Sequence, residues 1–246
     1  MTVSTDSGSR LTVVVPTYNR PGYLAECLTS IGRASITGFR LIILDNASTT
    51  DYSTVLDSHR SLNLEYVRNG ENIGAPRNIE RALRQFRDEE FLLVFHDDDI
   101  MHPRMMEWQL EALAANQDAS FACCQYLEFI DGTEPGYLAW DNLDGPCSEL
   151  VDAAGLSRRF MTDVPIAYGS TMYRTALMGT GEPDLGRFDM YADRPYLLDV
   201  VGAGTCAVLR APLVMYRLHK AQDSRSDVLT AQNLIQLMGA YRDVLP

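Results

Sequence analysis

The chain has no long hydrophobic run, and this lack argues against a membrane-spanning helix. No apolar stretch approaches the ~20 residues that such a helix requires. The first ten residues are rich in serine and threonine and contain no apolar core of a signal peptide, so we expect a disordered leader over residues 1–10. We therefore expect a cytoplasmic protein, and leave open a peripheral association with a membrane surface.

Cysteine and positive charge are both scarce. Five cysteines occur, an odd number, and none belongs to a C-x-x-C or Cys/His spacing, so we interpret them as reduced thiols. Lys and Arg number 21 against 33 Asp and Glu, and the resulting net charge of −12 argues against a DNA or RNA partner. The net charge is still compatible with a small phosphorylated ligand, provided that a divalent metal or local arginines offset the charge of that ligand.

Apolar strands alternate with helices in the first half of the chain. We expect strands over 11–15, 39–44, 64–67 and 91–95, and helices over 21–31, 53–59, 75–86 and 103–116. This βαβαβαβα order predicts a parallel sheet with helices on both faces.

After residue 117 the pattern is less regular. We expect strands over 121–130, 169–173, 205–209 and 213–217, helices over 149–161, 192–201 and 227–243, and a loop over 131–147. No Pro/Ser linker divides the chain, so we expect one domain over 11–246, made of 11–117, 118–220 and a C-terminal segment 221–246. The apolar residues of that last helix either cover the core or pair two subunits, namely Leu229, Leu234, Ile235, Leu237 and Met238.

The most informative segment follows the fourth expected strand. Residues 91–95 form a short apolar run that leads through His96 into three consecutive carboxylates, Asp97, Asp98 and Asp99. Adjacent carboxylates repel one another, so a cation, or a ligand carried by a cation, best explains their placement. The position agrees, because ligands of open α/β sheets lie beyond the carboxyl ends of the strands.

Polar residues also follow the three preceding strands. They are Pro16-Thr17-Tyr18-Asn19-Arg20 after the first, Asp45-Asn46 after the second, and the segment 69–78 after the third. In a parallel sheet these ends lie along one edge, so they are expected to line one cleft.

The order and spacing of these motifs resemble the family 2 glycosyltransferases of the GT-A fold. The matching pieces are Val15 to Arg20, Leu44 to Asp51, Asn72 to Asn78 and His96 to Asp99, with weaker matches at Arg187 to Asp193 and Tyr216 to His219. The resemblance covers about residues 11–220 and departs at two places: His96 replaces the first Asp of the usual Asp-x-Asp-Asp, and Ala192 replaces a Glu. It implies a Rossmann-like, mostly parallel sheet with an irregular acceptor-binding half at 118–220.

The resemblance also implies roles for single residues. The donor nucleotide would contact Pro16, Thr17, Tyr18, Arg20, Asp45, Arg77, Asp97 and Asp98. The metal ligands would come from Asp98, Asp99 and His219, and the general base would be Asp193, with Asp189 as the second candidate. For His96 two interpretations stay open, a ribose contact or a strand-end residue without a ligand.

The chemistry of these residue types agrees with such roles. Carboxylate oxygens suit Mg²⁺ or Mn²⁺, and a hard cation stabilises a departing nucleoside diphosphate. One base without a carboxylate nucleophile favours direct displacement with inversion at the sugar carbon. We therefore expect a sugar transferase with a UDP or dTDP donor and a hydroxyl acceptor on a small molecule, a glycan or a lipid-linked glycan. The alternatives are a catalytically degenerate nucleotide-binding scaffold and, less favoured, a sugar nucleotidyltransferase.

Overall fold

The computed structural model describes residues 10–140, 143–162, 166, 168–181, 183–184, 188, 192–220 and 231–245. Nearly all of the expected leader, residues 1–10, lies outside these ranges, as do Asp189 and Leu229.

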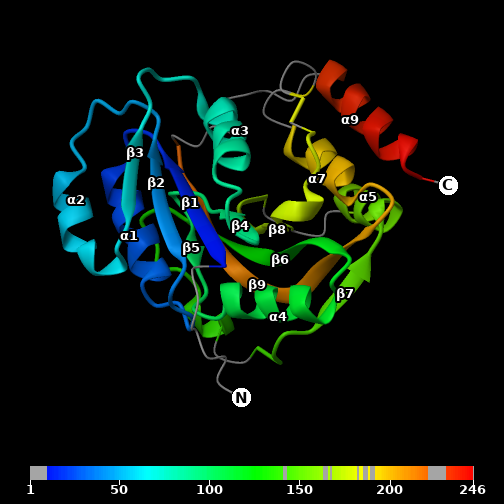
Figure 1. The fold of residues 1–246 in the computed structure, drawn as a ribbon, viewed down its shortest axis with the longest axis horizontal. Coiled ribbons are helices and arrows are strands. Elements are labelled where there is room, and N and C mark those ends of the chain that lie inside the picture. Colours follow the sequence, from blue (N-terminus) through cyan, green and yellow to red (C-terminus); the bar gives the residue numbers. More distant parts are fainter. Residues whose placement is uncertain are drawn as a thin grey trace.

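The first half forms the predicted parallel sheet. Strands β1 (Leu11–Thr17), β2 (Arg40–Asp45), β3 (Glu65–Arg68) and β4 (Phe91–Val94) lie in the order β3-β2-β1-β4, and all three neighbouring pairs are parallel. Helices α1 (Pro21–Ile31), α2 (Ser53–Ser58) and α3 (Ala75–Gln85) connect them, with a short 3₁₀ turn η1 (Arg60–Leu62) after α2. The alternation that was read from the sequence is thereby confirmed (Figure 1).

Alternating side chains of the central strands build a core on each face of this sheet. Successive residues of a strand point to opposite faces. Val13 and Leu93 accordingly pack with Leu28 of α1, whereas Val14 and Leu92 pack in a second cluster with residues of α3. The continuous apolar runs of β1 and β4 follow from this, because both of their faces are covered.

The second half extends the sheet with mixed strands. Beyond β4 the order continues through β8 (Met172–Arg174), β6 (Ala119–Ile130), β9 (Thr205–Leu218) and β5 (Ile100–Met101), and β7 (Ser148–Val151) pairs with β9. Strand β8 is antiparallel to β4 and β6, β5 and β7 are antiparallel to β9, and β6 is parallel to β9. Three 3₁₀ turns are also described here, η2 (Tyr137–Trp140), η3 (Tyr168–Ser170) and η4 (Thr175–Leu177).

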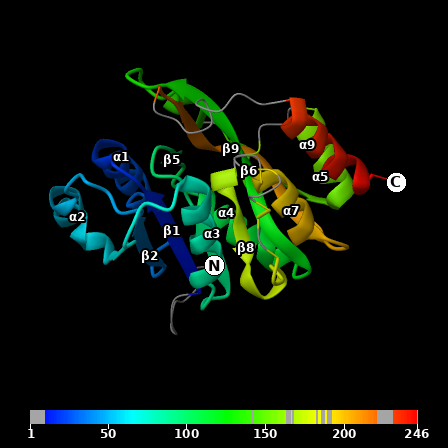
Figure 2. The ribbon, with the colours of Figure 1, turned by 90° about the horizontal axis from the view of Figure 1, so that it is seen from above.

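Helices cover both faces of the extended sheet (Figures 1 and 2). Helix α4 (Met105–Ala115) shares the core cluster of α1, while α5 (Ala153–Met161), α7 (Asp193–Val201) and α9 (Ala231–Asp243) contribute to the cluster of α3. None of the helices in the described ranges is long and apolar enough to cross a membrane.

Several expected elements were wrong in detail. The strand expected over 169–173 begins only at Met172, after the 3₁₀ turn η3. The helix expected over 149–161 begins only at Ala153, because Asp152 caps it by accepting a hydrogen bond from the Gly155 backbone (2.7 Å). The residues before that cap pair with β9 as β7. The strands expected over 205–209 and 213–217 form one strand, β9, whose register against β6 shifts at Pro212, which has no N–H to donate to a ladder.

The C-terminal helix α9 divides its apolar residues between the core and the surface. Leu237 and Tyr241 are buried, whereas Leu234, Ile235 and Met238 are exposed. The covering of the core is confirmed, and the pairing of two subunits through this helix stays a prediction.

Truncation of the sheet's central core is expected to destabilise the fold strongly. Leu93 of β4 is fully buried, so Leu93→Ala should lower the free energy of unfolding by about 2–5 kcal/mol through lost burial and a cavity. Leu177→Ala is the control, since Leu177 is 41% exposed and its replacement should change stability by about 0.5 kcal/mol or less. Urea denaturation followed by circular dichroism measures both, and equal losses would contradict the assigned core.

Candidate active site at the carboxyl ends of the parallel strands

The ends of β1, β2 and β3 lie in register at one edge of the sheet. Thr17 stands opposite Asp45, and Asp45 stands opposite Arg68. The acidic segment after β4 joins them, because the Thr17 hydroxyl donates a hydrogen bond to the Asp97 carboxylate (2.6 Å). Residues from four strand ends are therefore close neighbours.

Asp45 is fully buried and surrounded by donors from its own chain. It accepts hydrogen bonds from the Ser48 backbone N–H (3.0 Å) and the Tyr66 hydroxyl (2.7 Å), and the Arg68 guanidinium lies 3.1 Å away. Burial, followed by the bond to Asp45, raises the pKa of Tyr66. Tyr66 itself is 38% exposed, so it lies between buried Asp45 and solvent.

A turn after β1 is fixed by Asn19, which adopts a left-handed backbone conformation (φ 52°). Its side-chain oxygen accepts hydrogen bonds from the backbone N–H groups of Thr49 (2.8 Å) and Thr50 (3.1 Å). This arrangement places the Arg20 guanidinium 3.1 Å from Asp98. The neighbouring Tyr18 stays exposed at the surface of the turn.

Four asparagines join the ends of β2 and β3 to α3. Asn69 donates to Asn46 (2.8 Å) and Asn78 (2.9 Å), and Asn46 donates to Asn72 (2.7 Å). A hollow of about 420 Å³ borders this network and is lined by Asn69, Gly70, Glu71, Ile73 and Arg81. Arg77 is exposed in the first turn of α3, and its contact with a ligand stays a prediction.

The three consecutive carboxylates are all buried, with at most 7% of each residue exposed. Burial, reinforced by the charge of Asp98, raises the pKa of Asp97 to about 7. Burial and then the same neighbour raise the pKa of Asp99 well above its usual value. For Asp98 burial acts in the same direction, but the hydrogen bond to His219 and nearby positive charge outweigh it and lower the pKa.

Strand β9 and the residue that follows it supply groups that hold these carboxylates in place. The Arg217 backbone N–H donates to Asp99 (3.0 Å), and its Nε donates to the Asp98 carbonyl (2.8 Å). The guanidinium also bonds to Glu26 (2.5 Å) and Asp131 (3.0 Å). His219 Nε2 lies 2.9 Å from an Asp98 oxygen. Arg217 is therefore a positioning residue for the acidic segment.

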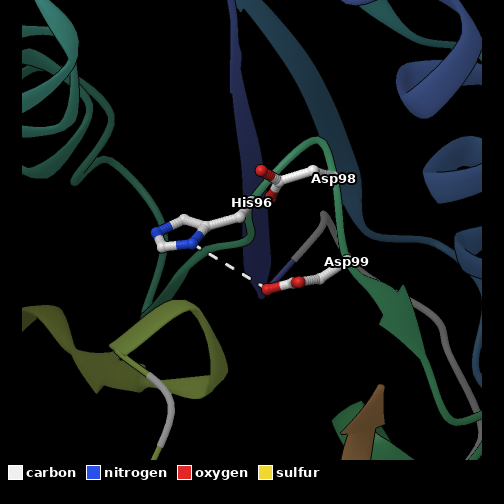
Figure 3. A group of neighbouring side chains, drawn as sticks. All are labelled: His96, Asp98 and Asp99. Atoms are coloured by element: carbon white, nitrogen blue, oxygen red, sulfur yellow. Dashed lines mark ion pairs between the residues drawn. The ribbon is translucent and has the colours of Figure 1, made fainter. Parts of the chain in front are cut away.

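One group of side chains can hold a metal ion. His96 Nδ1 and one oxygen each of Asp98 and Asp99 lie within 4.8 Å of one another. Asp99 Oδ2 is buried and accepts no hydrogen bond from the described residues, and the His96 ring faces it across 3.9 Å (Figure 3). Such a buried oxygen carries a desolvation cost that a cation offsets. The residues therefore fit a divalent ion at Asp98 and Asp99, while the direct role expected of His219 stays a prediction.

Asp193 is the first residue of α7 and is partly buried. Burial raises the pKa of its carboxyl group, with Arg194 and His96 acting in the opposite direction. The second base candidate, Asp189, lies outside the described residues, so it stays a prediction.

The structure adds contributors that the sequence did not reveal. His96 belongs to the group of metal-ligating atoms, and its place at the end of an apolar strand beside Asp97 was the available signal. Arg217 forms hydrogen bonds with residues about 120 positions away in the sequence, and no local sequence pattern predicts such contacts. Tyr66 covers Asp45 from the neighbouring strand, which only strand pairing could show.

With this geometry established, comparison with known proteins identifies the family. The family model described as glycosyl transferase family 2 matches residues 12–175, and the chain belongs to this family. Poly(ribitol-phosphate) beta-N-acetylglucosaminyltransferase TarS of Staphylococcus aureus is 34% identical over 97 residues, which are 37% of this chain and 17% of that relative. An uncharacterized glycosyltransferase of Haemophilus influenzae is 28% identical over 111 residues, 45% of this chain and 37% of that protein.

Solved structures share the fold over almost the whole chain. Residues 1–349 of S. aureus TarS with UDP-GlcNAc give a TM-score of 0.68 at 20% identity, covering 94% of this chain and 65% of that chain. Mannosyltransferase PcManGT of Pyrobaculum calidifontis with GDP-Man and Mn²⁺ gives 0.63 at 16% identity, covering 96% and 65%. These likenesses confirm the GT-A fold, and the chain spans less than two thirds of each of these two chains.

Removal of the Arg217 side chain is expected to loosen the acidic segment. Arg217→Met should lower the free energy of unfolding by about 1–3 kcal/mol, because the buried Asp98 carbonyl and two carboxylates lose a donor. Each kcal/mol should lower Tm by about 2–4 °C in a chain of this size. Arg210→Met on the same strand is the control, since Arg210 is exposed. Matching melting curves for the two variants would contradict the positioning role.

Proposed function

We propose that this protein is a glycosyltransferase that moves a sugar from a nucleoside-diphosphate donor to an acceptor hydroxyl, with inversion at the sugar carbon. The observation that carries the proposal is the group formed by His96, Asp98 and Asp99 after β4, whose metal-ligating atoms lie within 4.8 Å of one another. A base and a cation site at one sheet edge are what such a transfer needs. Family membership supports the reaction class.

We propose UDP as the donor nucleotide, with dTDP as the second choice. TarS, which shares the fold, was solved with UDP-GlcNAc and with UDP. The polar edge formed by Thr17, Asp45 and the asparagine network offers hydrogen-bonding groups for a base and ribose. Tyr18 and Pro16 border the same edge, and Arg77 lies exposed at the start of α3.

The leaving diphosphate needs positive charge on a chain whose net charge is −12. A divalent ion, Mg²⁺ or Mn²⁺, held by Asp98 and Asp99 would stabilise the negative charge that builds on the departing diphosphate. Arg20 contributes local positive charge beside Asp97 and Asp98. In this proposal the repulsion between the carboxylates is offset by the cation that accompanies the donor.

Asp193 is the proposed general base. A base of raised pKa accepts a proton from an acceptor hydroxyl more readily than an ordinary carboxylate does. Because Asp193 begins α7, its carboxylate lies at the positive end of the helix dipole, which opposes the rise in pKa that burial causes. With no carboxylate nucleophile assigned beside it, the transfer proceeds by one displacement, which inverts the sugar carbon.

Donor binding tests the proposal directly. Calorimetric titration with UDP is expected to show binding that strengthens with Mn²⁺, and Asp99→Asn should weaken the Mn²⁺-dependent part by about tenfold or more. Asp88→Asn is the control, since its side chain is 76% exposed. GDP and ADP serve as comparison ligands. If no nucleoside diphosphate binds under any condition, the degenerate scaffold becomes the better account.

Loss of the proposed base should separate chemistry from binding. Asp193→Asn is expected to reduce kcat for hydrolysis or transfer of the UDP-sugar by about 10²–10⁴-fold while UDP affinity stays within about twofold. Asp199→Asn is the matched control, because Asp199 lies exposed on the same helix. Undiminished turnover in Asp193→Asn would refute its assignment as the base.

A further inference from the structure

We propose that His96 is itself a ligand of the metal ion, so that the site is a mixed nitrogen–oxygen site that prefers Mn²⁺ over Mg²⁺. This inference rests on the proposed function for its biological use, but its evidence is the geometry around Asp99. It concerns a residue that interrupts the usual acidic pattern at the end of β4, where the sequence alone left the role of His96 undecided.

The separation of the two facing atoms is the first argument. His96 Nδ1 and Asp99 Oδ2 lie 3.9 Å apart, which is too long for a hydrogen bond. It is shorter than twice a metal–ligand bond of about 2.1 Å, so one ion between them can contact both atoms. An oxygen of Asp98 lies within 4.8 Å of both atoms and completes a group of three ligands (Figure 3).

The surroundings of Asp99 are the second argument. Its Oδ1 accepts a hydrogen bond from the Arg217 backbone, whereas Oδ2 is buried and accepts none from the described residues. Asp99 is 1% exposed, so bulk water does not offset the cost of burying that oxygen. The unpartnered atom is the one that faces His96, which points to a cation between them.

The backbone at Gly169 keeps the imidazole in this position. A Cβ atom at Gly169 would lie 3.1 Å from the His96 ring, so the ring packs directly against the backbone of η3. Replacement of His96 by a side chain of a different shape would disturb its packing against Gly169. A flat ring of the same size, by contrast, fits the same space.

Charge and ligand chemistry explain the preference for Mn²⁺. A neutral imidazole adds no negative charge to a segment that already contains three carboxylates. Mg²⁺ prefers oxygen ligands, whereas imidazole nitrogen binds first-row transition metals more strongly, with Mn²⁺ accepting both. An aspartate at position 96 would give an all-oxygen site of higher charge, which suits Mg²⁺ better.

The test measures metal binding directly, by electron paramagnetic resonance of Mn²⁺ added alone and then with UDP. Wild type should show nitrogen coupling from a bound histidine and a lower Kd for Mn²⁺ than for Mg²⁺. His96→Phe retains a ring against Gly169 and should lose the coupling and raise the Kd for Mn²⁺ by about tenfold or more. His96→Asp should retain metal binding and narrow the ratio of the two Kd values.

Two further variants make the outcomes distinct. His59→Asn is the control, because His59 bonds to Val55 and Thr29 and lies outside the group of metal-ligating atoms. Nitrogen coupling that persists in His96→Phe and disappears in His219→Phe would assign the nitrogen to His219 and overturn the proposal. Absence of Mn²⁺ binding in wild type, with and without UDP, would also overturn it. Mn²⁺ bound through His96 without any nucleotide binding would instead uphold this proposal and refute the proposed function.

Discussion

Burial of three adjacent carboxylates is the constraint on which the site depends. Each of them loses contact with water, and each repels its neighbours, so the segment after β4 needs donors and positive charge from elsewhere. Arg20 approaches from the turn after β1, Arg217 from β9, and His219 from the position that follows β9. The conformation of this segment therefore depends on residues from both halves of the sheet. The motifs that indicate the family follow the ends of the strands. The conformation of these motifs, however, depends on contacts with residues from both halves of the chain.

The same edge shows how a binding surface can be built from groups that also hold the fold together. Asp45 and the asparagines near it are largely engaged with their own neighbours, which fixes their positions before any ligand arrives. Such preorganisation lowers the cost of ordering on binding. The exception is Asp99, whose buried oxygen has no donor from the described residues. Within a well-satisfied polar network, that oxygen is the atom whose burial a cation would best offset.

A shared fold leaves room for differences in chemistry. The GT-A sheet positions the cation site and the proposed base, and the family contributes the expectation of a nucleotide-sugar donor. His96 and Ala192 are the places where this chain departs from the usual pattern. His96 Nδ1 lies 3.9 Å from Asp99 Oδ2, and Ala192 directly precedes the proposed base, Asp193. Both departures therefore lie at or beside the positions for which the proposals on metal preference and on the general base can be tested.

The sequence by itself determined the parallel half of the fold, because the alternation of apolar runs and helical patterns is a local property that the sheet preserves. It also determined which strand ends carry polar residues, and the family that they resemble. The tertiary structure alone decided that residues 149–151 join the sheet, since their pairing with β9 competes with helix propensity and wins. It likewise decided the roles of Arg217 and Tyr66, whose partners lie on other strands. Pairing between strands that are distant in sequence brings such residues together, and the spacing of residues along the chain does not predict that pairing.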